Sequence, residues 1–264
     1  MADHYALRDA KVVEKLRAAG AIILGKTNMT EWANFMSDKM TNGFSSRGGQ
    51  VKNPYGPFDV GGSSSGSAAG VASNLAVPAV GTETSGSIIN PAAQNSLVGI
   101  KPTVGLVSRT GIIPLSHTQD TAGPLARSVE DAVSVFAALI GTDSRDVITV
   151  LADQFRGYDW QQHLKSDGLS GVVLGLDRQL FKEIPDDQAK AFEAAMGQLR
   201  ACGATIKEVD IGTEQEDLGF AVLLHEFKAD LNAYLARSNP DHRIRSMSDI
   251  ISYNEEHAEQ MLKF

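Results

Sequence analysis

The sequence predicts an α/β protein with a mixed β-sheet flanked by helices, and three features of its 264 residues lead to this class. A helical pattern over 7–19 ends at Gly20 and is followed by the apolar run 21–24, an order typical of α/β proteins. A strand, a helix and a second strand follow one another in the same way over 172–209. Hydrophobic residues make up 42% of the chain, which is enough for a buried core.

The first half of the chain combines short strands with a glycine-rich stretch. Residues 41–70 are dominated by Gly, Ser, Asn and Pro, and a helical pattern begins only near their end, over 68–75. Apolar runs bounded by turn residues predict short buried strands. These predicted strands cover 21–24, 76–81, 97–100 and 105–107.

The second half of the chain is predicted to be mainly helical. Ser128 is placed to cap a helix that runs to about Ile140, with acidic residues in its first turn, where the helix dipole favours them. Apolar residues at helical spacing predict a helix over 186–201, which Gly203 closes. The remaining predicted elements are strands at 172–176 and 204–209 and helices near 214–237 and 247–264.

Composition and charge exclude several classes of function. The formal net charge of −8 argues against a nucleic-acid partner, whose phosphates need a basic surface. No apolar run approaches the ~20 residues of a membrane span, and the N-terminal segment shows no signal-peptide core. The single cysteine, Cys202, rules out an intrachain disulfide; we expect it to be a packing residue in a cytoplasmic protein.

Two small-residue loops stand out, G-G-S-S-S-G-S at 61–67 and T-E-T-S-G-S at 82–87. Glycine and serine let the backbone approach a ligand closely and aim several N–H groups at one point. An oxyanion hole for acyl transfer needs such donors, and a serine directly after them is well placed to attack. The loops therefore indicate a serine-dependent acyl-transfer site.

Other interpretations of these loops are open at this point. A Gly- and Ser-rich stretch is often a plain loop or linker. A phosphate-binding P-loop is disfavoured because Ser67-Ala68 stand where G-K-[ST] is required. Residues 62–66 match the G-x-S-x-G elbow of α/β-hydrolases with Ser64 as nucleophile, but two prolines within 53–59 disfavour the strand that this elbow needs.

The two loops together resemble the amidase signature. The resemblance includes S-L-V-G-I-K-P-T-V-G-L-V-S-R-T-G-I-I-P at 96–114 and T-Q-D-T-A-G-P-L-A-R-S-V-E-D-A at 118–132. Within the family the sequence is most similar to bacterial peptide amidases, through G-K-T-N-M-T-E-W-A-N-F and S-R-G-G-Q. The resemblance implies one partial amidase-signature α/β domain over 1–264, with a signature core at about 9–141 and a C-terminal α/β portion at about 142–264.

The family resemblance also implies the site residues. Ser87 maps to the nucleophile, and Ser63, on a cis peptide bond, maps to the serine that relays its proton. The backbone N–H groups of Thr84, Ser85 and Gly86 map to the oxyanion hole. The implied reaction is the two-step hydrolysis of a carboxamide, without a metal or an organic cofactor.

The third catalytic residue of the family is a lysine, and we do not identify it among these residues. In the family it stands in a motif of L-K-D-N type upstream of the segment that matches G-K-T-N, so Lys26 is rejected and is expected to be solvated. Lys101 is expected to be structural, and Lys165 lies downstream in polar surroundings. Relative to the family the chain is therefore expected to be truncated at both ends. Either the complete protein has more residues, or a second chain supplies them, or this chain is inactive.

The expected activity is that of an amidase on linear amides other than peptide bonds, with a small-molecule or peptide amide as partner and no nucleic acid or membrane. Ile88-Ile89-Asn90 follow where many glutamine-using relatives have S-I-R, which favours larger neutral substrates such as peptide C-terminal amides. The alternatives are a glutaminase subunit of the amidotransferase A type and an inactive fragment that acts as a binding module.

Other polar residues near the loops are weaker candidates. His117 and Asp120 could form a Ser–His–Asp triad with a nearby serine, but the family mechanism does without histidine and a single histidine near a turn is usually solvated. Glu83 could orient the second loop or be a buried structural carboxylate. Asp120 and Arg127 are expected to hold loops in place.

Overall fold

The computed structural model describes residues 5–181, 184–211, 218–238 and 240–263. The chain divides into two compact units, of which unit 1 comprises Met1–Asp159 and Gly219–Phe264 and unit 2 comprises Trp160–Leu218. Each unit combines helices with a sheet, antiparallel in unit 1 and parallel in unit 2, which confirms the predicted α/β class. The single domain predicted over 1–264 stays a prediction.

A three-stranded antiparallel sheet organises unit 1. Its strands β3, β5 and β4 lie in the order β3-β5-β4, and Gly81 of β3 pairs with Gly123 of β5. All six residues of β5 are buried. The strands are β3 (Pro78–Glu83), β4 (Val98–Gly99) and β5 (Thr121–Ala126), and a separate hairpin pairs β1 (Phe44–Ser45) with β2 (Gly49–Gln50).

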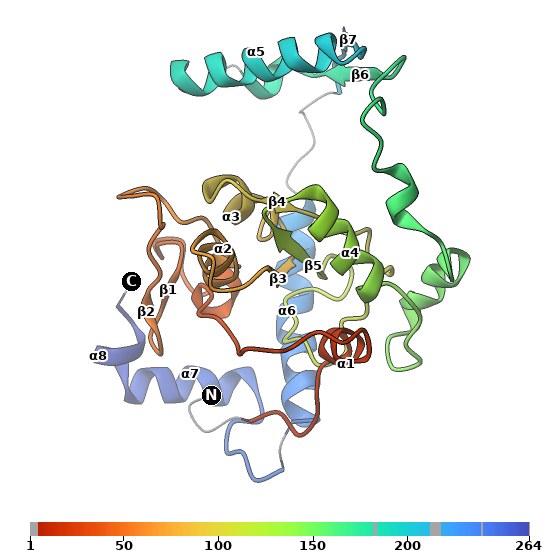
Figure 1. Cartoon of the computed structure of the whole chain (residues 1–264). Helices are drawn as coiled ribbons and strands as arrows, with labels where there is room; N and C mark the ends of the chain where they lie inside the picture. Colours follow the sequence, from red (N-terminus) through yellow and green to blue (C-terminus); the bar gives the residue numbers. More distant parts are fainter. Residues whose placement is uncertain (1–4, 182–183, 212–217, 239, 264) are drawn as a thin grey trace. The chain divides into compact units, whose positions relative to one another are not determined.

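Helices cover both faces of this sheet. Ala122 and Leu125 are an odd number of residues apart in β5, so their side chains point to opposite faces. Ala122 packs with residues of α1 and α4, whereas Leu125 packs with residues of α2 and near α3, and Figure 1 shows α2 and α4 on either side of the strands. Both serine-containing loops lead into helices of the Leu125 face. The helices are α1 (Lys11–Ala18), α2 (Ser65–Ala72), α3 (Ile89–Gln94) and α4 (Val129–Leu139).

The C-terminal helices of unit 1 share a third core cluster. Leu231 and Leu235 of α6 pack against Ile250 of α7. The helix predicted over 247–264 breaks at His257, whose φ and ψ of −120° and 34° are not helical; residues 212–217 and 264 lie outside the described residues. Within the described ranges, no helix is long and apolar enough to cross a membrane. The helices are α6 (Leu218–Ala236), α7 (Met247–Glu256) and α8 (Ala258–Met261), and short 3-10 helices cover Glu31–Asn34, Val147–Phe155, Trp160–His163 and Arg178–Phe181.

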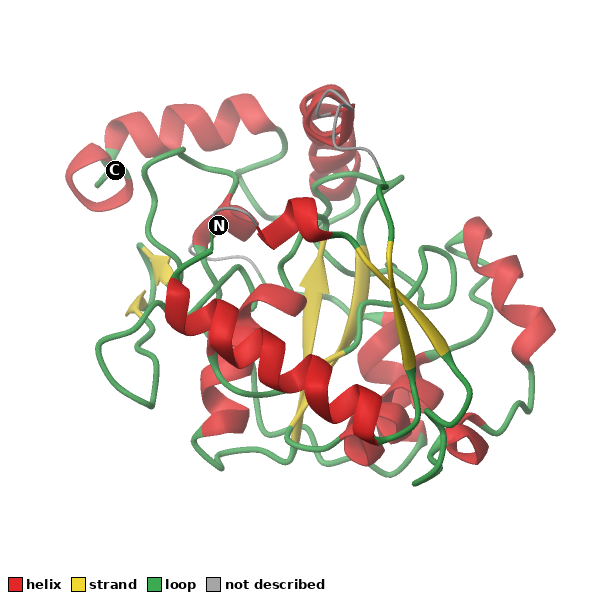
Figure 2. Cartoon of the chain, turned by 90° about the horizontal axis from the view of Figure 1, so that it is seen from above, coloured by secondary structure: helices red, strands yellow, loops and turns green. Residues whose placement is uncertain are grey.

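Unit 2 contains the predicted strand–helix–strand arrangement. β6 (Val173–Leu176) and β7 (Thr205–Glu208) pair in parallel, and α5 (Asp186–Ala201) lies beside them in both views (Figures 1 and 2). Gly203 follows α5 with a φ of +95°, which favours glycine at the end of a helix. The prediction that Cys202 is a packing residue is wrong, because this thiol is exposed at the helix end.

The strand predicted over 21–24 does not form. This segment has no regular structure, and Ile22 and Leu24 are 86% and 75% exposed. An apolar run becomes a strand only when a neighbouring strand pairs with it, and no described strand does so here.

Two further predictions about strands differ from the structure. Residues 105–107 contribute only a bridge between Val107 and Ile140. β5 is not predicted from the sequence, because Pro124 disfavours a central strand. The strand tolerates this proline, whose carbonyl accepts a hydrogen bond from the amide of Ile100 at 3.1 Å.

An ion pair ties the loop around Arg109 to the segment that follows α4. Arg109 Nη2 lies 2.5 Å from Oδ1 of Asp146, and Arg109 Nε and main-chain N donate to Oδ2 at 3.0 and 2.8 Å. The two side chains are only 19% and 8% exposed. Burial acts to raise the pKa of Asp146, but the hydrogen bonds and charge of Arg109 outweigh burial and hold this pKa below its ordinary value.

Asp146→Asn is expected to lower the free energy of unfolding by about 3 kcal/mol at neutral pH, because it removes the counter-charge of a largely buried guanidinium. The folded-state pKa is depressed, so this stabilisation is present above a pH of about 4 and is lost as the pH falls through the folded-state value. Urea unfolding at several pH values checks this, with the exposed Asp167→Asn as control. A deficit that does not shrink on acidification would contradict the assignment.

Candidate active site

Most hydroxyls of the first loop are used to build the structure. Ser64 Oγ donates to the carbonyl of Thr82 and accepts from its amide, both at 3.1 Å. The hydroxyls of Ser65 and Ser67 donate to main-chain carbonyls at 2.6 and 2.9 Å. The alternative of an α/β-hydrolase elbow with Ser64 as nucleophile therefore does not fit, because this hydroxyl is buried and bonded to strand β3.

Ser63 differs from its neighbours. The peptide bond between Gly62 and Ser63 is cis, the conformation that the family resemblance implies here. Ser63 is fully buried, its carbonyl accepts from the amide of Thr30 at 3.0 Å, and its hydroxyl has no hydrogen-bond partner among the described residues. Because buried polar atoms are nearly always hydrogen-bonded, this hydroxyl is an exception, one of four such side-chain atoms among the described residues.

The two loops meet at their serines. The amide of Ser64 donates to the carbonyl of Ser87 at 3.2 Å, and Oδ1 of Asn90 accepts from the amide of Gly62 at 3.0 Å. Ser87 is 8% exposed, and its hydroxyl makes no hydrogen bond to the parts of the chain that are described, Ser63 included. Residues predicted from separate motifs are thus neighbours in space, and the hydroxyls of Ser63 and Ser87 make no hydrogen bond among the described residues.

A buried carboxylate closes the turn that contains Ser87. Oε2 of Glu83, which is 5% exposed, accepts from the amides of Ile88 and Ile89 at 2.7 and 3.0 Å. The side chain of Glu83, just before residues 84–87, thus bonds to the two amides just after them and holds this segment as a loop. Gly86 in this segment has a φ of +79°, which favours glycine.

Asp120, which directly precedes strand β5, supports the same segment. Its Oδ1 accepts from the Thr84 hydroxyl at 2.5 Å. Burial raises the pKa of Asp120, against the opposing effect of hydrogen bonds from Thr84, Ser116 and Leu115. The pairing of Asp120 with His117 that a Ser–His–Asp triad needs is absent from the described structure, since His117 instead lies 2.9 Å from Asp230 and is 61% exposed.

The comparisons with known proteins bear on this arrangement. The family model described as Amidase matches residues 1–262. The chain belongs to the amidase family. It is 45% identical over 260 residues to a probable amidase of Arabidopsis thaliana, which covers 96% of this chain and 49% of the relative.

Two further relatives of this amidase-family chain differ in their names. The native peptide amidase of Stenotrophomonas maltophilia has a TM-score of 0.90 at 44% identity, over 97% of this chain and 53% of that structure. A relative from Salinibacter ruber, named as a subunit of glutamyl-tRNA(Gln) amidotransferase, is 39% identical over 239 residues, 90% of this chain and 44% of the relative. The chain therefore spans about half the length of the relatives it matches.

No lysine amine of the described residues donates to Ser63 Oγ in this amidase-family chain. Lys26 and Lys165 are exposed, and Lys101 Nζ donates to the carbonyl of Pro102. Burial lowers the pKa of Lys15, but its Nζ donates to the carbonyl of Ile140 at 2.5 Å. Of the lysines that the sequence analysis rejected, Lys26 and Lys165 are thus exposed, and Lys101 is bonded to a main-chain carbonyl.

Two residues of the G-K-T-N-M-T segment support the site and were not predicted. Thr30 is fully buried; besides the bond to Ser63, its hydroxyl accepts from the amide of Gly43 at 2.8 Å. The carbonyl of Asn28 accepts from the amide of Gly66 at 2.9 Å, at the start of α2. The family motif indicated this segment, but its contacts with the first loop are visible only in three dimensions.

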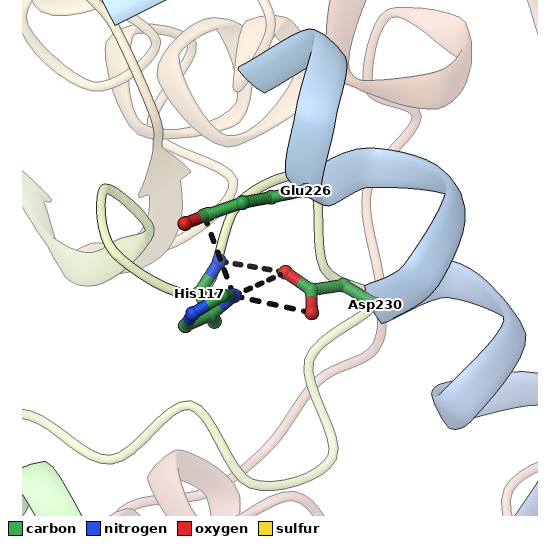
Figure 3. Close-up of side chains that lie close together, drawn as sticks. All are labelled: His117, Glu226 and Asp230. Atoms are coloured by element: carbon green, nitrogen blue, oxygen red, sulfur yellow. Dashed lines mark hydrogen bonds and ion pairs between the residues drawn. The ribbon is translucent and has the colours of Figure 1, made fainter. Parts of the chain in front are cut away.

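One cluster has the side chains of a metal site. Ligand-type atoms of His117, Glu226 and Asp230 lie within 4.8 Å of one another (Figure 3). Both carboxylates, however, already accept hydrogen bonds from residues 116–118. The hydrogen bonds of this cluster therefore connect helix α6 to the turn over residues 116–118.

Proposed function

We propose that this chain carries the serine core of an amide hydrolase in which Ser87 is the nucleophile. Ser87 attacks the carboxamide carbon, its proton passes through Ser63, an amine or ammonia leaves, and water releases the acyl group in a second step. The backbone N–H groups of Thr84, Ser85 and Gly86 stabilise the negative oxygen of the intermediate. The observation that carries this proposal is that Ser63 alone keeps a free hydroxyl in a loop whose other serines are hydrogen-bonded.

The proposal includes a lysine base, and we do not assign this role to Lys26, Lys101 or Lys165. To accept a proton at neutral pH, a lysine with an ordinary pKa of about 10.4 must be made neutral, which costs roughly 4.6 kcal/mol and lies within what burial can do. A further segment of the protein or a second chain would supply it. Without this base we expect slow but measurable reaction, because the oxyanion donors alone retain part of the rate.

For the substrate we propose linear amides with a large neutral acyl part, such as peptide C-terminal amides. A relative of this chain is named a peptide amidase, and Ile88-Ile89-Asn90 follow Ser87 without the arginine of the S-I-R that many glutamine-using relatives carry. We expect neither a nucleic acid nor a membrane as partner, and a cytoplasmic location.

The second candidate is a glutaminase subunit, because a relative of the chain is named as part of a glutamyl-tRNA(Gln) amidotransferase. The two candidates predict different competitors of the serine reaction. A peptide C-terminal amide slows labelling of Ser87 if the first is correct, whereas only glutamine does so if the second is correct.

A fluorophosphonate probe tests the proposal on the chain itself. Wild type is expected to be labelled, Ser87→Ala is expected to lose the label, and Ser134→Ala, on the exposed side of α4, is the matched control. Labelling that persists in Ser87→Ala, or a folded wild type that is not labelled, would reject the hydrolase and favour a binding module.

A further inference from the structure

A single buried carboxylate connects residues 84–87, which we name the oxyanion segment, to a neighbouring turn over residues 115–120. Asp120 is 8% exposed, and its Oδ1 accepts from the Thr84 hydroxyl at 2.5 Å. Its Oδ2 accepts from the amides of Leu115 and Ser116 at 2.8 and 3.0 Å. One oxygen therefore restrains the oxyanion segment, while the other restrains the 115–120 turn.

Helix α6 holds the other side of this turn. Glu226 accepts from the hydroxyl of Ser116 at 2.6 Å and from the hydroxyl of Thr118 at 3.0 Å. One helical turn later, Asp230 accepts from the His117 amide at 2.8 Å and lies 2.9 Å from the His117 ring nitrogen Nδ1 (Figure 3). The turn that carries Asp120 is thus fixed at three successive residues by one helix.

We propose that Asp120 is a positioning residue for the oxyanion segment, and that Glu226 extends this support to helix α6. The proposal rests on the proposed function, because it matters only if the segment binds a developing oxyanion. Thr84 is the first residue of the segment, so a bond to its side chain restrains the direction of the amides that follow. A displacement of about 1 Å in catalytic geometry can cost about 100-fold in rate.

The test compares two threonines of the same part of the fold, Thr84, which is half-buried, and Thr121, which is buried. Thr84→Val removes the hydroxyl that meets Asp120, whereas Thr121→Val removes a buried hydroxyl that has no hydrogen-bond partner among the described residues. Thr84→Val is expected to slow fluorophosphonate labelling of Ser87 by about 10- to 100-fold. Thr121→Val is expected to react like wild type, and Thr84→Ser, which keeps a hydroxyl, is expected to restore most of the rate.

A double variant tests whether Thr84 acts through its hydrogen bond to Asp120 or whether each substitution disturbs the fold independently. If Thr84 acts through Asp120, Thr84→Val is expected to slow Asp120→Asn much less than it slows wild type, because the two groups share one bond. Glu226→Gln is expected to slow labelling more than Glu255→Gln, an exposed change on α7.

The outcomes distinguish the two proposals. If wild type reacts at Ser87 and Thr84→Val reacts equally fast, the positioning role is overturned while the hydrolase stands. It is also overturned if Thr84→Ser is as slow as Thr84→Val, or if the effects of Thr84→Val and Asp120→Asn simply multiply. If wild type is not labelled at Ser87, both proposals fall.

Discussion

Ser63→Ala is expected to slow the reaction of Ser87 with a fluorophosphonate by at least about 1000-fold when the proposed lysine base is present, while the free energy of unfolding stays equal or rises. The rate falls because the proton of Ser87 loses its proposed path through Ser63 to that base. Stability does not fall because the Ser63 hydroxyl is fully buried and has no hydrogen-bond partner in the described structure. Alanine lacks this hydroxyl, so the substitution removes an unsatisfied polar atom and breaks no hydrogen bond of the side chain.

The matched control is Ser65→Ala, two residues along the same loop. The Ser65 hydroxyl is equally buried, but it donates to the carbonyl of Gly61 at 2.6 Å and lies 3.2 Å from Thr30 Oγ1. Its loss is expected to cost about 1–3 kcal/mol of stability. Labelling kinetics and urea unfolding of both variants check the contrast. Ser63→Ala that reacts at the wild-type rate, or that loses as much stability as Ser65→Ala, would contradict the assignment.

Gly66→Ala is expected to lower the free energy of unfolding by about 3 kcal/mol. A Cβ at this position would lie 2.3 Å from the carbonyl oxygen and 2.8 Å from the amide nitrogen of Asn28. Both are backbone atoms, and the same carbonyl accepts the Gly66 amide at 2.9 Å, so neither can move away without breaking the contact that seats the start of α2. Because Ser63 immediately precedes this turn, labelling of Ser87 is expected to slow as well.

Gly70→Ala is the control, because it makes the same change one turn later in α2. The nearest atom to its Cβ is Thr27 Cγ2 at 4.0 Å, an ordinary contact distance. Alanine is the better helix former, so this variant is expected to gain up to about 1 kcal/mol. Urea unfolding curves of the two variants provide the measurement. If Gly66→Ala raises the free energy of unfolding as Gly70→Ala does, the backbone of Asn28 does not exclude a side chain at position 66.

Helices were predictable where their signals are local. Ser128 Oγ accepts from the amide of Asp131 at 3.1 Å, as its position before α4 predicts. α5 covers the predicted range 186–201. Strands were less predictable, because pairing depends on residues far along the chain. The run 21–24 has strand composition but no described partner, while β5 contains a proline and still forms the middle of the sheet.

The site could be predicted as residues but not as an arrangement. The motifs pointed to Ser63, Ser87 and the 84–87 backbone, and these loops are neighbours in the structure; their catalytic roles stay a proposal. The motifs did not indicate that Thr84 and Asp120 form a bond across 36 residues, or that helix α6 holds the turn beside it. No spacing rule connects residues so far apart in sequence.

The order of residues was enough to establish the α/β class, the capped helices and membership of the amidase family, because caps, hydrophobic periodicity and motif order act over short stretches of chain. The sequence did not show which serine of the first loop has a hydroxyl without a hydrogen bond. Only the tertiary structure shows that this serine is Ser63. Ser64 and Ser67 bond to strand β3, at Thr82 and Val80, and these partners reach them only after the sheet has formed. A hydroxyl's freedom to react depends on what surrounds it in space, and composition along the chain does not contain that information.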